Sequence, residues 1–237
     1  MFAVKKILMF LRRMFPPFIL FFLLTLISGC QAAQGVKTYQ LPGEATALSR
    51  IGVLPFHDFT PTDQSVKMTS CPICGETFQT EKLADSAEKI VGELVLTSLR
   101  RFKQYTFVNP DQTAEVYERY RAAGTTALPE LVSKTGKELN VDAILVGFVF
   151  RYRERKGYPY SVEKPASVAF DLHLIRVKDG LTIWRGSFDK TQSSLMEDVF
   201  QVSSFFSGGG KWVTAKELAT EGLPLVLKTF PGVNEKK

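Results

Sequence analysis

The chain has few of the residues that usually carry chemistry. Its 237 residues include three cysteines, two histidines and two tryptophans. So few cysteines exclude a small scaffold held together by several disulfides. The glycines at 208–210 precede Lys211, but this stretch lacks the GxxxxGK[ST] pattern of a phosphate-binding loop. It is therefore interpreted as a hinge.

The chain also lacks a strong net charge once its first segment is set aside. The formal charge is +6, from 30 basic and 24 acidic residues. Four of the basic residues lie in an N-terminal segment interpreted below as a signal: Lys5, Lys6, Arg12 and Arg13. Without them 26 basic residues face 24 acidic ones. Proteins that bind nucleic acids usually carry an excess of positive charge that contacts the phosphate backbone. This chain has almost none, so no nucleic-acid partner is expected.

The N-terminal apolar run is too short for a membrane-spanning helix. It extends from Phe15 to Ile27, where about 20 apolar residues are needed, and Pro16 and Pro17 interrupt its start. A basic segment, a short apolar segment and small residues before a cleavage point are typical of a secretory signal peptide. We therefore predict a signal over residues 1–29, which leaves 208 residues for one domain.

The end of this signal resembles the bacterial lipobox. Its residues read Ile27-Ser28-Gly29-Cys30, and in that motif cleavage occurs just before a cysteine that carries diacylglycerol. Cys30 is therefore the predicted attachment site for diacylglycerol and an N-acyl chain, which together hold a protein stably on a bilayer. Gln31 follows where Asp would retain the protein, so the resemblance implies the outer membrane, with the body facing the periplasm. An ordinary secretory signal with an incidental Cys30 is the alternative.

The other two cysteines form one CxxC motif, Cys71-Pro-Ile-Cys74. In an oxidising compartment we rank a disulfide between them first. A metal site ranks second, because a closed zinc site needs four ligands and the chain offers only His57 and His173 besides the two cysteines. Such a site would be completed by His57 or across two subunits. Dithiol exchange ranks third, because no predicted helix begins directly after the motif to activate a thiol. We expect no resident cofactor.

Apolar periodicity predicts a single α/β domain over residues 50–230, between a flexible tether at 30–49 and a disordered tail at 231–237. Residues 57–80 are rich in turn-forming types and form a predicted long loop. The elements expected in order are a strand at 50–56, a helix at 81–102, a strand at 104–110, helices at 111–122 and 128–138, strands at 141–150, 166–177 and 181–190, and a helix at 211–228.

This order predicts a mixed β-sheet with flanking helices. The continuous apolar run at 141–150 is typical of a strand buried on both faces near the centre of a sheet. Asp179-Gly180 joins two alternating runs, which is a strong hairpin signal. The first part of the fold is therefore βαβ-like, and its last strands are antiparallel.

Several phrases resemble one group of proteins. They are IGVLPF after the tether, YTFVNP, GKELNVDAILVGFV, and the hairpin VAFDLHLIRVKDGLTIWRGSF. Over residues 48–230 the chain is similar to the CsgG-like and TolB N-terminal-domain-like envelope lipoproteins, a group that includes the Pel export lipoprotein and the activators of penicillin-binding proteins. The resemblance implies a non-enzymatic scaffold or accessory subunit with envelope proteins as partners, and self-association in a ring.

Two segments are candidate partner surfaces. The segment 151–160 interleaves basic and aromatic residues that suit anionic headgroups, a polysaccharide or an acidic protein, with a solvated loop as the alternative: Arg151, Tyr152, Arg153, Arg155, Tyr158 and Tyr160. The segment 199–206 is more apolar than a short loop requires, and it contains Phe205 and Phe206.

No catalytic residues are predicted. His57-Asp58 follows a strand, but no nucleophile has a recognisable spacing to it. His173 lies mid-strand beside Asp171, where a satisfied sheet histidine is expected. The function predicted is thus an outer-membrane-anchored periplasmic scaffold in an assembly, secretion or polysaccharide-export system. The alternatives are an envelope redox or metal-binding protein that uses Cys71 and Cys74, and a glycan-binding lipoprotein.

Overall fold

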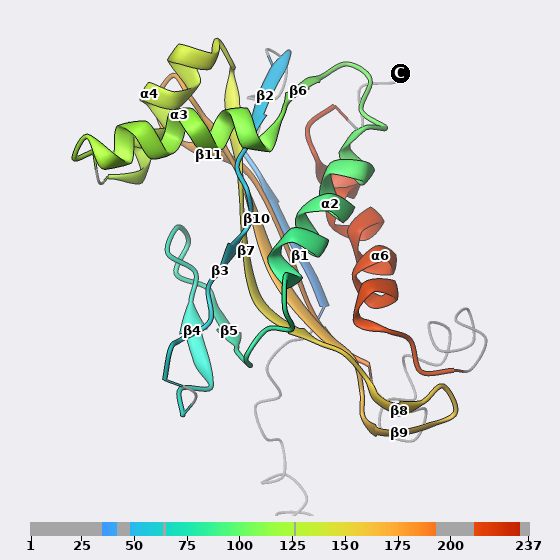
Figure 1. Cartoon of the computed structure of the whole chain (residues 1–237). Coiled ribbons are helices and arrows are strands. Elements are labelled where there is room, and N and C mark those ends of the chain that lie inside the picture. Colours follow the sequence, from blue (N-terminus) through green and yellow to red (C-terminus); the bar gives the residue numbers. More distant parts are fainter. Residues whose placement is uncertain (1–34, 42–47, 64, 126, 193–210, 233–237) are drawn as a thin grey trace, which may run out of the picture. The chain divides into compact units, whose positions relative to one another are not determined.

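The computed structural model describes residues 35–41, 48–63, 65–125, 127–192 and 211–232. The described residues belong to one compact unit built around a seven-stranded mixed sheet (Figure 1). The strands of this sheet are β1 (Gly35–Gln40), β2 (Arg50–Val53), β3 (His57–Asp58), β6 (Thr106–Val108), β7 (Ala143–Arg153), β10 (Ser167–Arg176) and β11 (Thr182–Thr191). Two small hairpins lie outside it: β4 (Met68–Ser70) with β5 (Thr77–Gln79), and β8 (Lys156–Tyr158) with β9 (Ser161–Lys164).

The sheet order is β1-β11-β10-β7-β2-β6, with β3 pairing along β7. Strands β2, β6 and β7 are parallel, and β7, β10, β11 and β1 are antiparallel. This arrangement confirms the predicted mixed α/β sheet, its βαβ start and its hairpin at Asp179-Gly180. Strand β7 is central and buried almost throughout, as its unbroken apolar run predicted.

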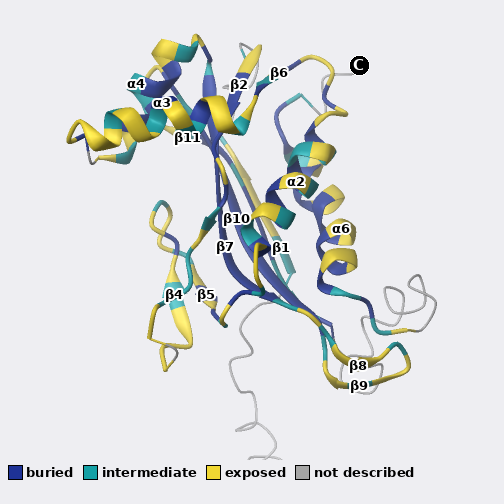
Figure 2. Ribbon diagram, in the orientation of Figure 1, coloured by how far each residue is buried: buried dark blue, intermediate teal, exposed yellow. Residues whose placement is uncertain are grey.

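Helices and a hairpin cover the two faces of the sheet. Helices α2 (Ala87–Leu99) and α6 (Ala215–Val226) lie on one face, where they bury residues such as Val91 and Leu218 (Figures 1 and 2). Helices α3 (Pro110–Ala122) and α4 (Leu128–Leu139), together with the β4–β5 hairpin, lie on the other side. There the ring of Phe78 on β5 stacks on Phe150 of β7, with ring centroids 4.2 Å apart. The domain therefore has an apolar core on each face of the sheet.

The helix boundaries follow from local chemistry. The side chain of Asn109 accepts a hydrogen bond from the backbone N–H of Asp111, and Pro110 occupies the first turn of α3. Thr214 and Glu217 form a reciprocal capping box at the start of α6. Pro224 does not end α6, because the helix continues to Val226 and buries that side chain in the core.

Three segments differ from the sequence prediction. The expected tether at 30–49 contains β1, which is held at the edge of the sheet by backbone hydrogen bonds to β11 and has too little apolar alternation to be recognised. The expected loop at 57–80 contains β3 and the β4–β5 hairpin. The segment 151–160, for which a solvated loop was the alternative, forms the end of β7, strand β8 and the turn that precedes β9. Residues 1–34, which include the predicted signal at 1–29, and residues 233–237 of the predicted tail at 231–237 lie outside the described residues.

Arg151 belongs to the core, so its predicted place on a partner surface is wrong. Its side chain is 4% exposed and donates to Ser167 Oγ, to the backbone oxygen of Gln79 and to Asp189. Tyr152 is 1% exposed, and Arg153 is paired with Glu81. These residues alternate between the two faces of β7, and both faces are covered.

Replacing Arg151 with methionine is expected to lower the free energy of unfolding by about 3 kcal/mol, because Asp189 and Gln79 lose their partner inside the protein. Urea unfolding measures the change. Arg119→Met is the control: the side chains of Arg119 and Glu138 are 57% and 35% exposed, so this pair should contribute under about 1 kcal/mol. Equal shifts for the two variants would contradict the structural role of Arg151.

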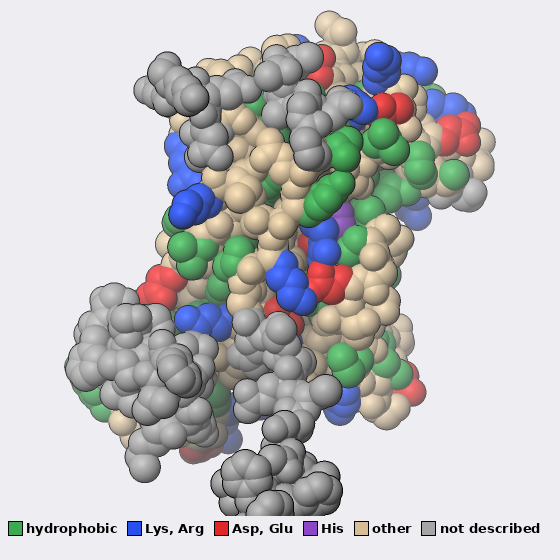
Figure 3. All heavy atoms as spheres, turned by 180° about the vertical axis from the view of Figure 1, so that it is seen from behind, with side chains coloured by type: hydrophobic (Ala, Val, Ile, Leu, Met, Phe, Trp, Pro, Cys, Tyr) green, Lys and Arg blue, Asp and Glu red, His purple; other side chains and the backbone are tan. Residues whose placement is uncertain are grey.

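No helix among the described residues is both long enough and apolar enough to cross a bilayer. From behind, Lys and Arg side chains are interspersed with Asp and Glu over the visible surface (Figure 3). The face in view therefore presents no extended field of one sign, in keeping with the near-neutral composition.

Candidate functional site

Two polar residues interrupt the apolar middle of strand β10. Asp171 and His173 are both 0% exposed, and they stand two positions apart, so their side chains project from the same face of the sheet. This is the face that the β4–β5 hairpin covers, since His173 lies against the ring of Phe148 in that core. Burial of two ionisable groups at the centre of a sheet requires partners.

The partners come from the turn of the β4–β5 hairpin, which contains the CxxC motif. The backbone N–H of Cys71 donates to the oxygen of Glu76 at 2.7 Å, and the N–H of Gly75 donates to the oxygen of Cys71 at 2.9 Å. Gly75 has a φ of 74°, which glycine adopts without strain. The tight turn leaves Cys71 buried and Cys74 exposed, with both thiols on one side.

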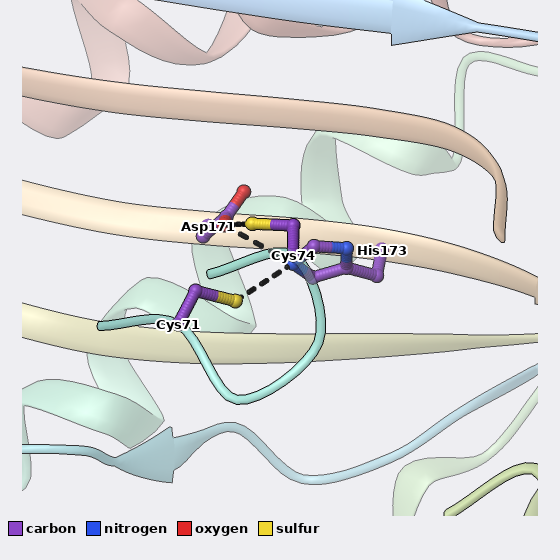
Figure 4. A group of neighbouring side chains, drawn as sticks. All are labelled: Cys71, Cys74, Asp171 and His173. Atoms are coloured by element: carbon purple, nitrogen blue, oxygen red, sulfur yellow. Dashed lines mark hydrogen bonds and ion pairs between the residues drawn. The ribbon is translucent and has the colours of Figure 1, made fainter. Parts of the chain in front are cut away.

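The four side chains converge (Figure 4). Nε2 of His173 lies 3.2 Å from Sγ of Cys71 and 3.1 Å from Oδ2 of Asp171. Sγ of Cys74 lies 3.5 Å from the same carboxylate oxygen. One sulfur, nitrogen or oxygen atom from each residue lies within 4.8 Å of all the others. The fold thus places two thiols, an imidazole and a carboxylate around one point.

A second layer of charged groups surrounds this cluster. Arg185, which pairs with His173 across β10 and β11, donates to both carboxylate oxygens of Asp171. Arg185 also pairs with Glu76, and Glu76 in turn pairs with Lys37 of β1 at 2.6 Å. The turn is thereby connected to three adjacent strands, β10, β11 and β1.

Burial and hydrogen bonding shift the pKa values within the cluster. Burial alone would lower the pKa of His173, but its contacts with Asp171, Cys71 and Cys74 raise it to about 11. Burial would raise the pKa of Asp171, but His173 and Arg185 outweigh it and hold that pKa below its ordinary value. Burial raises the pKa of the Cys71 thiol despite its hydrogen bond with His173. The raised pKa makes Cys71 a poor nucleophile for thiol exchange.

Both cysteines are free thiols in the structure, where the sequence favoured a disulfide between them. Their sulfurs meet Asp171 and His173, about a hundred positions further along the chain. His57, the histidine considered as a metal ligand, lies outside the cluster and against the ring of Phe148. The sequence analysis did not bring Asp171 and His173 together with the cysteines, although two polar residues on one face of an apolar strand were a visible signal.

Three of the other predicted surface residues, Arg155, Tyr158 and Tyr160, lie at the β8–β9 hairpin or directly before it. Tyr158 and Tyr160 are 78% and 79% exposed at its turn, and Arg155 donates to the backbone oxygen of Gly157. The backbone N–H of Trp212 donates to the oxygen of Pro159, so a third aromatic residue borders the turn. Phe205 and Phe206 lie outside the described residues.

The sheet register places this hairpin at the end where β1 begins. Gly35 pairs with Asp189 near the end of β11, and Ser167 pairs with both Thr191 and Arg153. The β8–β9 hairpin extends beyond this end of β7 and β10 (Figure 1). The start of β1 and the exposed tyrosines therefore share one end of the sheet.

Comparison with solved structures gives remote likenesses. The PelC dodecamer from Paraburkholderia phytofirmans is 16% identical with a TM-score of 0.45, over 81% of this chain and 93% of that chain. The LpoB C-terminal domain from Salmonella enterica is 14% identical with a TM-score of 0.37, over 63% of this chain and 87% of that chain. Lipoprotein GNA1162 from Neisseria meningitidis is 16% identical with a TM-score of 0.36, over 68% of this chain and 98% of that chain.

No family model matches the chain, and no curated protein matches it. The likenesses to solved structures are too remote to carry an argument about function. The expected resemblance to CsgG-like proteins stays a prediction, and function has to be argued from the residues of this chain.

Proposed function

We propose that the chain is a non-enzymatic accessory lipoprotein of a bacterial envelope, anchored through acyl chains on Cys30. The observation that carries the proposal is the shared end of the sheet: β1 begins five residues after Cys30, and the exposed tyrosines project from that same end. Five residues span at most about 18 Å. An anchor at Cys30 would therefore hold this end of the sheet against the membrane.

The hairpin has the composition of a membrane-interface contact. Tyrosine and tryptophan favour the headgroup region, where an apolar ring and a polar group are both accommodated. Tyr158 and Tyr160 are exposed, and Lys156 beside them is 75% exposed, although it also pairs with Glu163. Such a contact would orient the domain on the bilayer that its acyl chains already reach.

Anchoring supplies the mechanism of an accessory protein. A tethered domain is concentrated near other proteins held at the same membrane, so weak contacts become occupied. Gln31 after the acylated cysteine favours the outer membrane, and the partners expected are other envelope proteins and further copies of this chain. The near-neutral charge argues against a nucleic-acid partner.

Hydrogen exchange in proteoliposomes tests the orientation. With the acylated protein in phospholipid vesicles, we expect amide exchange in residues 154–164 to slow severalfold relative to the detergent-solubilised protein, while residues 68–79 are unchanged. Replacing Tyr158 and Tyr160 with serine should abolish the difference, whereas Tyr39→Ser should preserve it, because Tyr39 is an exposed tyrosine further along β1. Equal exchange in vesicles and detergent would refute the orientation.

A glycan is the second candidate ligand of the hairpin, because two adjacent exposed tyrosines also suit stacking on sugar rings. Glycan binding and membrane binding predict different results in the hydrogen-exchange experiment. Slower exchange of residues 154–164 on adding soluble envelope polysaccharide to the detergent-solubilised protein would favour the glycan, and no response would favour the membrane.

A further inference from the structure

We propose that Cys71, Cys74, Asp171 and His173 bind one zinc ion. The two cysteines come from the turn of the β4–β5 hairpin, and the other two residues come from strand β10 (Figure 4). The site would then be a closed four-ligand centre that fastens the hairpin to the sheet.

The spacing of the ligand atoms fits a tetrahedral ion. Zinc bonds of about 2.3 Å to sulfur and about 2.0–2.2 Å to nitrogen and oxygen place neighbouring ligands about 3.3–3.8 Å apart. The three separations described above are 3.2 Å, 3.1 Å and 3.5 Å. All six separations are within 4.8 Å, so side-chain shifts of up to about 1 Å would bring the four atoms to tetrahedral spacing.

The chemistry of the ligands selects the metal. Two thiolates and an imidazole are softer than the all-oxygen shells that Ca²⁺ and Mg²⁺ require. A tetrahedral set of two sulfurs, one nitrogen and one oxygen is a donor set that zinc accepts. The turn itself supports this assignment, because a CxxC followed by glycine directs two sulfurs to one side of a tight hairpin.

The surrounding charges complete the site. Two thiolates and one carboxylate exceed the charge of Zn²⁺ by one, and the Arg185 guanidinium on Asp171 offsets the difference. Arg185 also fixes the orientation of the carboxylate, as partners of metal ligands commonly do. On binding, the two thiols and Nε2 of His173 would release their protons to solvent.

A disulfide explains the cluster less well than a metal does. A bond between the two sulfurs would remove the thiol protons from the contacts of Cys74 with Asp171 and of Cys71 with His173, and Asp171 and His173 are fully buried. Nδ1 of His173 already lacks a hydrogen-bond partner within the described part of the chain, so the ring would lose one of its two contacts at Nε2. Asp171 would keep its hydrogen bonds from Arg185, so the loss falls on the buried imidazole.

The two histidines of the chain provide a matched test. The acylated protein in detergent is reduced, stripped with a chelator and titrated with Zn²⁺ against a chromophoric competitor. We expect one zinc per chain, with affinity reduced at least 100-fold in His173→Ala and unchanged in His57→Ala. Circular dichroism of the apo proteins checks that both variants fold, and Cys74→Ser, altered at an exposed position, is the second ligand variant.

Cobalt substitution reports the ligand geometry independently of affinity. Co²⁺ in the wild-type protein should show the intense visible bands of a tetrahedral site and a thiolate charge-transfer band, and His57→Ala should retain both. The proposal is overturned if zinc binds with the same affinity to wild type and His173→Ala, if it does not bind, or if the cobalt spectrum is octahedral.

Discussion

Removing zinc is expected to lower the free energy of unfolding by about 4 kcal/mol when the free zinc concentration had been about 1,000 times its dissociation constant. The folded state brings together ligands more than ninety positions apart in the chain, which the unfolded chain does not. For a domain of this size such a change corresponds to a fall in Tm of roughly 10 °C. Urea unfolding of one preparation with zinc and with chelator measures it.

The loss should be concentrated in the β4–β5 hairpin. Each of its strands has three residues, and its main apolar contact with the sheet is Phe78 on Phe150. Two such short strands are marginal without further support. Amide exchange in residues 68–79 should therefore accelerate in the apo protein more than exchange in β7.

Cys74→Ser is the control for this prediction. Its unfolding should respond little to zinc, because three remaining ligands hold the ion less tightly. The interpretation fails if the wild-type protein has the same unfolding midpoint with zinc and with chelator, or if Cys74→Ser retains the full response.

Replacing Cys30 with serine should move the protein from the membrane fraction to the soluble fraction almost completely. Each buried methylene of an acyl chain contributes about 0.8 kcal/mol to membrane binding, so two or three chains outweigh any contact made by the hairpin. The variant should be exported with an ordinary cleavable secretory signal, so that no uncleaved apolar segment remains. Fractionation with immunodetection measures the distribution.

Cys74→Ser is again the matched control, since it removes an exposed cysteine without touching the anchor. It should remain in the membrane fraction. An exported Cys30→Ser protein that still sediments with membranes would show that another part of the chain, and not the lipid, determines its location.

Periodic apolar patterns predicted the framework of the fold from sequence. Strand β7 was recognisable from the continuous apolar run at 141–150, and α2 because Val91, Val95 and Leu99 share one face. The β10–β11 hairpin was recognisable from its Asp-Gly turn. In each case the information lay within one segment of the chain.

Features held by distant partners could not be predicted in the same way. Strand β1 depends on backbone hydrogen bonds to β11, which leave little trace in side-chain pattern. The cluster depends on a register that brings Cys71 to His173, and a local reading of the CxxC motif favours a disulfide instead. Arg151 was assigned to a surface because the sequence shows its charge. The sequence does not show that both faces of its strand are covered.

The proposed function depends most on the chemical state of Cys30, which mass spectrometry of the N-terminal peptide from protein isolated from its native envelope measures directly. We predict a peptide that begins at Cys30 and carries the added mass of a diacylglycerol group and an N-linked acyl chain. A peptide with an unmodified Cys30, or one that retains residues 1–29, would contradict it.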